Sequence, residues 1–174
     1  FDEDPLTDKG RVYIDIETDS LNPNIIWQIG LYNEVNNSYK YFIENEDPTD
    51  KSGIINDFLK WLDSIRDDVC FVSWHGSQFD YRHLNDFIDR FGDEKYIKSW
   101  RETEKIDLLH QVAKSCVALP TRSFSLEDVA SRLGYEKNIK GLSGSQAGEV
   151  YSSWVRGSGG EPDWDKWVLY CKDD

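Results

Sequence analysis

The sequence contains no methionine and only three cysteines, Cys70, Cys116 and Cys171. It has no CxxC spacing, and any disulfide would leave one cysteine unpaired, which argues against a zinc site and a disulfide-stabilised fold. No apolar stretch approaches the length of about 18 residues that a membrane-spanning helix needs. The first residues also lack the basic and apolar regions of a signal peptide. These absences predict an intracellular, cytoplasmic protein with reduced thiols and no membrane partner.

Basic residues are scarce as well. The chain has 20 Lys and Arg against 33 Asp and Glu, which gives a formal net charge of −13. Proteins that bind nucleic acid by electrostatic attraction usually present a basic stripe to the phosphates. The composition therefore argues against tight nucleic-acid binding by this chain alone. Bound divalent cations would remove part of the negative charge, and a partner domain could supply a basic groove.

The length of 174 residues and the hydrophobic content of 39% fit a single domain with one well-buried core. We expect residues 1–10 to be a linker and residues 11–174 to form the domain. A start without methionine and an end on a candidate site acid suggest a fragment of a larger protein, cut in its last helix.

The first half of the chain predicts a sheet followed by a helical crossover. Three β-rich runs are separated by turn-forming residues and predict an antiparallel meander. An amphipathic pattern and then a buried apolar run predict a helix that leads into a parallel strand. The three runs, the helix and the strand cover residues 12–16, 25–32, 39–43, 53–65 and 69–74.

The second half adds further helices. Residues 79–91 have helical periodicity, residues 105–109 predict a short strand or the entry of a helix, and residues 125–133 predict a capped helix. After the glycine-rich turn at 156–162, apolar residues recur at helical spacing from Trp164 to Cys171. This order predicts an α/β fold in which a mixed sheet, of three antiparallel and then parallel strands, has helices on both faces.

Asp15 and Glu17 lie two residues apart in the first β-rich run, so both side chains should project from the same face of the strand. Unpaired buried charge is costly, so two such acids on a central strand would need a cation or hydrogen-bond partners. The alternative is an edge strand whose acidic face is solvated. The flanking aliphatic residues favour the central position.

Asp80 stands where the run from Val72 enters a predicted helix. An acid at this place can belong to a site, or can simply interact with free backbone amides and the helix dipole. His75 could line the same site or be an ordinary loop histidine. Gly76 could supply a positive φ or permit a close approach of backbone or substrate.

Tyr170 and Asp174 are four residues apart in the last predicted helix and therefore share a face. A phenol beside an attacking water molecule can orient it, although a pair with this spacing can also be an ordinary surface pair. Asp173 points about 100° away from Asp174 on the helix, so we expect Asp174 to be the site residue.

Three short motifs in this order resemble a known family. Asp15-Ile-Glu-Thr18, Gly76-Ser-Gln-Phe-Asp80 and Tyr170-Cys-Lys-Asp-Asp174 are similar to the motifs of the DEDD (DnaQ-like) 3′ to 5′ exonucleases, in the tyrosine-containing (DEDDy) branch of this ribonuclease H-like group. The chain looks most like family-B DNA polymerase proofreading domains and the exonuclease-like domains fused to RecB-type nucleases or helicases. Residues 106–110 and 123–129 support this, because those domains carry a similar Asp-Leu-Leu and Ser-Leu pair.

The resemblance implies a ribonuclease H-like fold and a site for two divalent cations, Mg²⁺ or Mn²⁺, as expected for all-oxygen ligands. One cation would be held by Asp15, Glu17 and Asp174, and the other by Asp15 with Asp80 contributing through water. Tyr170 would orient the attacking water. Asp107 would be a structural or supporting acid.

The resemblance also implies that the substrate is the single-stranded 3′ end of DNA or RNA, cut to 5′ mononucleotides. Thr18, Trp74, His75, Gly76 and Phe79 are the candidate substrate-binding residues, and Trp74, Phe79 and Tyr81 could stack on unpaired bases. Polymerase-like members usually have Asn-Gly where this chain has His75-Gly76, so the contact to the terminal nucleotide would differ. Partners would include a polymerase, helicase or RecB-like nuclease domain of the parent protein.

Two other functions fit the same residues. An inactive ribonuclease H-like module could serve as a scaffold or partner-binding surface, which the acidity supports. A structure-selective endonuclease is also compatible, because function depends on the site and not on the fold.

Overall fold

The computed structural model describes residues 8–113 and 121–174, and is built around a five-stranded sheet in the order β3-β2-β1-β4-β5. β1 pairs antiparallel with β2, and β2 with β3, whereas β4 is parallel to β1 and β5 to β4. The predicted mixed sheet is confirmed. The strands are β1 (Gly10–Thr18), β2 (Ile26–Asn33), β3 (Ser38–Ile43), β4 (Val69–Ser73) and β5 (Lys105–Asp107).

One boundary differs from the sequence-based expectation. Gly10, expected at the end of a linker, opens β1: it pairs with Val69, and its amide donates to the carbonyl of Asp68 at 3.0 Å. Residues 1–7 of the expected linker and Cys116 lie outside the described residues.

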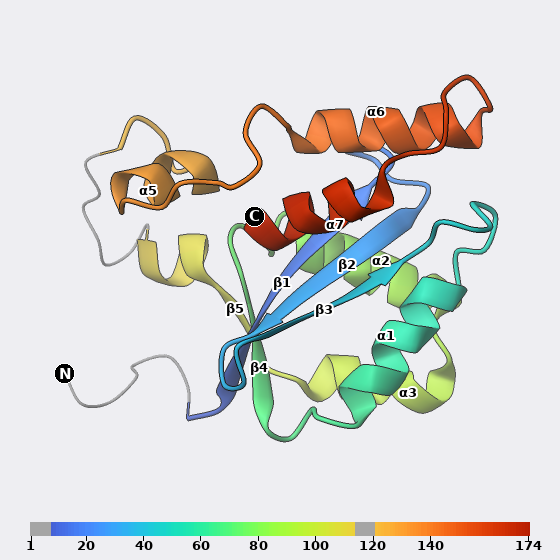
Figure 1. The fold of residues 1–174 in the computed structure, drawn as a ribbon. Coiled ribbons are helices and arrows are strands. Elements are labelled where there is room, and N and C mark those ends of the chain that lie inside the picture. Colours follow the sequence, from blue (N-terminus) through green and yellow to red (C-terminus); the bar gives the residue numbers. More distant parts are fainter. Residues whose placement is uncertain (1–7, 114–120) are drawn as a thin grey trace.

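Helices cover both faces of the sheet (Figure 1), as predicted. On one face, the even-numbered side chains of β1, such as Val12 and Ile14, pack with Phe58, Leu84 and Trp100 in the main core. These three side chains come from α1 (Gly53–Asp63), α2 (Asp80–Phe91) and α3 (Glu94–Glu102). The period of two in β1 therefore places its odd-numbered residues, including both acids, on the opposite face.

The opposite face is covered by α6 (Gly144–Val155) and α7 (Trp164–Asp173). A second core forms there, in which the ring of Trp27 stacks on Tyr151 with centroids 5.2 Å apart. Trp167 and Tyr170 of α7 belong to the same core and are buried. This packing fixes α7 over β1 and β2, and so brings the C-terminal end of the helix to the acidic residues.

The segments 105–113 and 125–134 agree with the expected pattern, whereas α3 and α6 lie where the sequence predicted no helix. β5 is followed by a π-helical turn, η1 (Leu109–Ala113), so residues 105–109 are both a short strand and a helix entry. α5 (Leu126–Arg132) is capped by Ser125, whose side chain accepts from the amide of Asp128, and Gly134 follows with φ of 88°.

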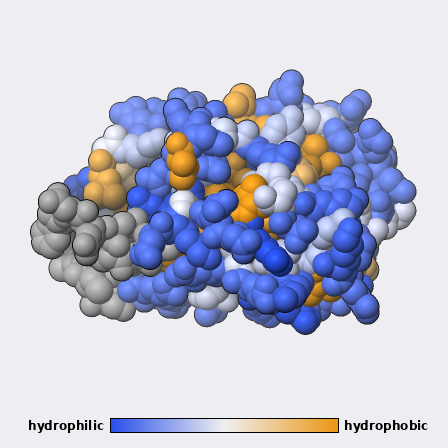
Figure 2. Space-filling view, turned by 90° about the horizontal axis from the view of Figure 1, so that it is seen from below, coloured by the Kyte–Doolittle hydropathy of each residue, from blue (hydrophilic) through white to orange (hydrophobic). Residues whose placement is uncertain are grey.

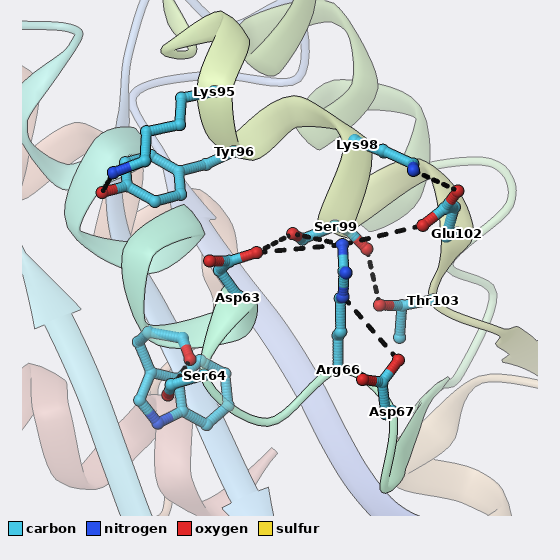
Figure 3. A network of polar contacts seen from close by, with 11 residues as sticks. Asp63, Ser64, Arg66, Asp67, Lys95, Tyr96, Lys98, Ser99, Glu102 and Thr103 are labelled. Atoms are coloured by element: carbon cyan, nitrogen blue, oxygen red, sulfur yellow. Dashed lines mark hydrogen bonds and ion pairs between the residues drawn. The ribbon is translucent and has the colours of Figure 1, made fainter.

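A polar network joins α1 to α3 on the face away from the acids (Figure 3). The guanidinium of Arg66 donates to Ser99 Oγ at 3.2 Å, and this hydroxyl donates to Asp63 at 2.5 Å. Arg66 also pairs with Glu102 at 3.6 Å. Because Ser99 and Glu102 belong to α3 and Asp63 to α1, the network fastens α3 to α1.

The surface seen from below is mostly hydrophilic, with isolated hydrophobic residues (Figure 2). Single exposed apolar residues are common on globular proteins. Among the described residues, no helix combines the length and the apolar character that crossing a membrane requires.

Candidate functional site

Acidic residues from three elements meet on the face of the sheet covered by α7. Asp15 and Glu17 come from β1, which lies between β2 and β4, so the edge-strand alternative is wrong. Glu17 is only 5% exposed. Asp80 lies at the start of α2 and Asp174 at the end of α7. The four acids that the sequence singled out are therefore brought together.

The carboxylate of Asp80 is directed at β1. Its Oδ1 accepts the backbone amide of Ile16 at 3.2 Å, and the residue is 5% exposed. The acid lies in the first turn of α2, where it also meets the positive end of the helix dipole. The contact with Ile16 directs the side chain toward β1, the strand that carries Asp15, and a role of Asp80 in a metal site stays a prediction.

Cys171 of α7 contacts β1 directly. Its thiol donates to Asp15 Oδ2 at 3.3 Å. Gly30 stands opposite Asp15 in β2, and a Cβ there would lie 2.5 Å from the sulfur of Cys171. The absence of a side chain at Gly30 therefore lets α7 approach the strand closely enough for this contact.

Asp173 and Asp174 have different partners. Asp173 accepts from Tyr135 Oη at 2.9 Å, from Asn138 Nδ2 at 2.6 Å and from the amide of Ile139 at 2.8 Å. Asp174 forms an ion pair with Lys137 and lies beside the phenol of Tyr170. Asp173 therefore holds the segment 135–139, while Asp174 faces the other acids, as the helical spacing predicted.

Burial and mutual repulsion make the cluster a poor place for negative charge. The pKa of Asp15 is raised by burial and then by the charges of Asp80 and Asp174. Burial also raises the pKa of Glu17, with Asp15 as the next cause. Burial raises the pKa of Asp80 to about 7, although the hydrogen bond from Ile16 opposes the rise. A bound cation would offset the cost of burying these carboxylates and their mutual repulsion.

The donor atoms fit a divalent cation. Ligand atoms of Asp15, Glu17 and Cys171 lie within 4.8 Å of one another. Carboxylate oxygens are the donors preferred by Mg²⁺ and Mn²⁺, and the thiol adds one softer donor. The charges of Asp80 and Asp174 also raise the pKa of Asp15, although among the described residues neither acid belongs to this set of ligand atoms.

A cavity of about 630 Å³ opens beside the acids. Asp15, Asp80 and Asp174 line it at one end, and Tyr13, Tyr32 and Glu34 line it farther along β1 and β2. Leu108, Leu126 and Ala130 add apolar surface, and Lys137 and Lys172 add positive charge. The cavity has room for a ligand that carries both apolar rings and anionic groups.

Of the five residues expected to bind substrate, Trp74 lines this cavity, and its indole nitrogen donates to the carbonyl of Phe124 at 2.9 Å. The other four do not line it. Thr18 donates to the carbonyl of Ser20, and the ring of Phe79 lies 4.7 Å from that of His83. His75 and Gly76 form the turn before α2. Substrate contact by these four stays a prediction.

The turn before α2 contains one residue with a positive φ and one position without room for a Cβ, and these are neighbouring residues. His75 has the positive φ, 66°, whereas Gly76 supplies the close approach: a Cβ there would lie 1.8 Å from Ser73 Oγ. Asp107 accepts the amides of His75 at 3.1 Å and of Ser77 at 2.9 Å. Asp107 thus supports the turn that positions Asp80, in agreement with the prediction of a structural or supporting acid.

Sequence reasoning missed two residues of the site, Cys171 and Lys137. The sequence pattern places Cys171 only on the apolar face of the last helix, although its spacing of three from Asp174 puts both residues on one face. Lys137 lies in a segment without helical or strand periodicity, and no pattern in the sequence indicates that it contacts Asp174.

Comparison with known proteins identifies relatives of the whole site-bearing region. The family model described as RNase_H superfamily matches residues 12–174. Apo exonuclease I is 15% identical over 87% of this chain and 42% of its own, with a TM-score of 0.50. E. coli exonuclease I in complex with a 5cy-dA13 oligonucleotide is 15% identical over 86% of this chain and 40% of its own, also at 0.50. At this identity the similarity concerns the fold.

The chain spans about two fifths of the length of these two exonuclease I chains. Among curated protein sequences, no significant match is found.

Proposed function

The chain belongs to the RNase_H superfamily, and on this premise we propose that it is a metal-dependent 3′ to 5′ exonuclease of the tyrosine-containing DEDD branch. It hydrolyses phosphodiester bonds at single-stranded DNA or RNA 3′ ends and releases 5′ mononucleotides. The observation that carries the proposal is the convergence of Asp15, Glu17, Asp80 and Asp174 beside one cavity, with Tyr170 next to Asp174.

The four carboxylates would hold two Mg²⁺ or Mn²⁺ ions: Asp15, Glu17 and Asp174 one of them, and Asp15 with Asp80 the other. When bound, such a pair of ions activates the attacking water and stabilises the charge that develops on the leaving 3′ oxygen. The donor set supports this assignment because its carboxylates are buried and repel one another.

Tyr170 orients the attacking water through its hydroxyl. Burial and the charge of Asp174 raise the pKa of Tyr170 above its ordinary value, so the phenol stays protonated near neutral pH. It therefore acts as a hydrogen-bond donor and acceptor and not as a phenolate base.

The cavity supports a nucleic-acid strand as the substrate. Its aromatic residues, including Trp74 and Tyr135, offer faces on which unpaired bases stack. The exonuclease I structure solved with a dA13 oligonucleotide is consistent with a DNA strand. We further propose that the chain is one domain of a larger protein with a polymerase, helicase or RecB-like nuclease, whose surface supplies the positive charge that this chain lacks.

Digestion of labelled single strands tests the function. With Mn²⁺ present, a 5′-labelled DNA or RNA oligonucleotide should shorten progressively, and a 3′-labelled one should release its labelled mononucleotide at once. Asp15→Asn and Asp80→Asn should each reduce the rate at least about 100-fold, since each removes a ligand charge. Asp86→Asn, an exposed change in α2 with the same charge difference, should leave the rate unchanged.

A circular single strand separates the alternatives. An exonuclease leaves it intact, whereas cleavage of the circle would indicate an endonuclease. If neither DNA nor RNA is degraded in an Asp15-dependent way and calorimetry detects no Mn²⁺ binding, the domain is a scaffold and the proposed enzyme activity is wrong.

A further inference from the structure

Lys137 places a positive charge inside the acidic cluster. Its ammonium forms an ion pair with Asp174 and lies 5.4 Å from the centre of the Tyr170 ring. Both partners are well covered, with side-chain exposures of 21% for Lys137 and 17% for Asp174. The lysine is thus in contact with a proposed ion ligand, and solvent screens the pair only in part.

The charge of Lys137 reaches beyond Asp174. It partly offsets the rise in pKa that burial and neighbouring carboxylates cause at Asp15 and Glu17. Lys172, the other lysine that lines the cavity, is exposed and lies 5.8 Å from the ring of Tyr39. Among the residues that the structure describes, the ammonium of Lys137 is therefore the cation that the fold directs at the proposed ion ligands.

The position of Lys137 is fixed by its neighbours in the chain. Tyr135, Asn138 and the amide of Ile139 all donate to Asp173. These three contacts fasten the chain on both sides of Lys137 to the end of α7. Lys140, three residues on, is instead exposed and pairs with Glu136 at 3.5 Å, outside the cavity. The segment thus carries one lysine directed inward and one directed outward.

We propose that Lys137 is an internal counter-ion for the acidic cluster. A divalent ion that binds there must displace the ammonium of Lys137 from Asp174 or share this carboxylate with it. This rests on the proposed function, because it concerns the same ion site. A fixed positive charge a few ångströms from a doubly charged ion is repulsive, so Lys137 raises the ion concentration at which the site fills. In the absence of ions the same charge stabilises the fold against repulsion among the acids.

Lys137→Met and Lys140→Met provide a matched pair, since both remove one positive charge from the same segment. Calorimetry should show that Lys137→Met binds Mn²⁺ roughly three- to tenfold more tightly than the native protein. Lys140→Met should bind Mn²⁺ with native affinity. Lys137→Arg keeps the charge and should stay close to the native affinity.

Thermal unfolding provides a second, independent measurement. In chelator, Lys137→Met should melt at a lower temperature than Lys140→Met, because its cluster has lost the counter-ion. Addition of Mn²⁺ should then raise the melting temperature of Lys137→Met by more than that of the native protein. Opposite effects of one substitution with and without ions are not expected of a residue that only packs.

Two results would overturn the inference. Weaker Mn²⁺ binding by Lys137→Met would mean that the lysine merely holds Asp174 in place. Equal melting temperatures of the two Met variants in chelator would mean that Lys137 does not offset the negative charge of the cluster. The proposed function fails in a different way, namely when Asp15→Asn neither abolishes Mn²⁺ binding nor reduces strand degradation. The chelator experiment tests the counter-ion role even in that case.

Discussion

The thiol of Cys171 lies 3.3 Å from Oδ2 of Asp15 and so joins the last helix to the central strand at the acidic cluster. Burial raises the pKa of this thiol, and the charges of Asp15 and Glu17 raise it further. Without a metal the residue is therefore a neutral hydrogen-bond donor to Asp15. A soft metal ion, which binds thiolate strongly, would change that state.

The first prediction concerns soft metals. Because Asp15, Glu17 and Cys171 present ligand atoms within 4.8 Å of one another, Cd²⁺ should bind through the sulfur. Ultraviolet spectra should show a sulfur-to-cadmium charge-transfer band, and Cys171→Ser should lack it. Cys70→Ser, which changes a buried thiol in the core with Val72 and Ile106, should keep the band. A band of equal intensity in Cys171→Ser would contradict the prediction.

The second prediction concerns the space that Gly30 leaves for α7. A methyl group there would meet the sulfur of Cys171 at 2.5 Å and the hydroxyl of Tyr39 at 2.6 Å. Gly30→Ala should therefore lower the free energy of unfolding by about 1–3 kcal/mol, measured by chemical denaturation. Gly144→Ala, in α6, meets nothing within 4 Å and should be neutral or slightly stabilising. Equal stability of both variants would show that α7 can shift without cost.

The strands and four of the helices could be predicted because the apolar residues within each of them recur at the period of a strand or of a helix. The even positions of β1 are buried in the main core, and the expected amphipathic helix 53–65 corresponds to α1. α6 was not predicted, since it contains Gly144, Gly148 and three serines, which have low helix propensity. Its place is determined by tertiary packing, in which Tyr151 stacks on Trp27.

The acids of the site could be predicted for a related reason. Asp15 and Glu17 share a face through the period of a strand, and Tyr170 and Asp174 through that of a helix. Contacts between distant segments have no such signal. The ion pair of Lys137 with Asp174 depends on how the chain between 134 and 140 crosses the end of α7, which the three hydrogen bonds to Asp173 decide.

The third prediction concerns pH and the stability of the ion-free protein. Burial raises the pKa of Asp80 from 3.8 to about 7. Between these values the folded protein keeps a proton that the unfolded chain has released. The stabilisation from Asp80 is thus fully present below about pH 4 and is lost as the pH rises through about 7. In chelator the native protein should be less stable at pH 8 than at pH 5.

Asp80→Asn should make this loss smaller, by up to roughly 1.4 kcal/mol per pH unit within the window, because the amide does not titrate. Asp15 and Glu17 have pKa values raised in the same direction, so part of the slope should remain. Asp86→Asn in the exposed part of α2 is the control and should keep the native slope. An unchanged slope in Asp80→Asn would mean that this carboxyl is ionised in the folded protein.

The fourth prediction contrasts two adjacent acids. Asp173 accepts three hydrogen bonds from the segment 135–139, so Asp173→Ala leaves their donors without this acceptor. It should lower the free energy of unfolding by about 1–3 kcal/mol. Asp174→Asn removes one charge from the repelling cluster along with its pairing to Lys137, and these effects oppose each other. Its stability in chelator should therefore change little.

Metal binding should show the reverse order. Calorimetry should find that Asp174→Asn binds Mn²⁺ at least about tenfold more weakly, because a ligand charge is lost, whereas Asp173→Asn keeps most of the affinity. The comparison uses Asn at both positions so that size and charge change equally. Loss of Mn²⁺ binding in Asp173→Asn with retention in Asp174→Asn would mean that the two acids have exchanged roles. The helical spacing from Tyr170 would then not identify the ligand.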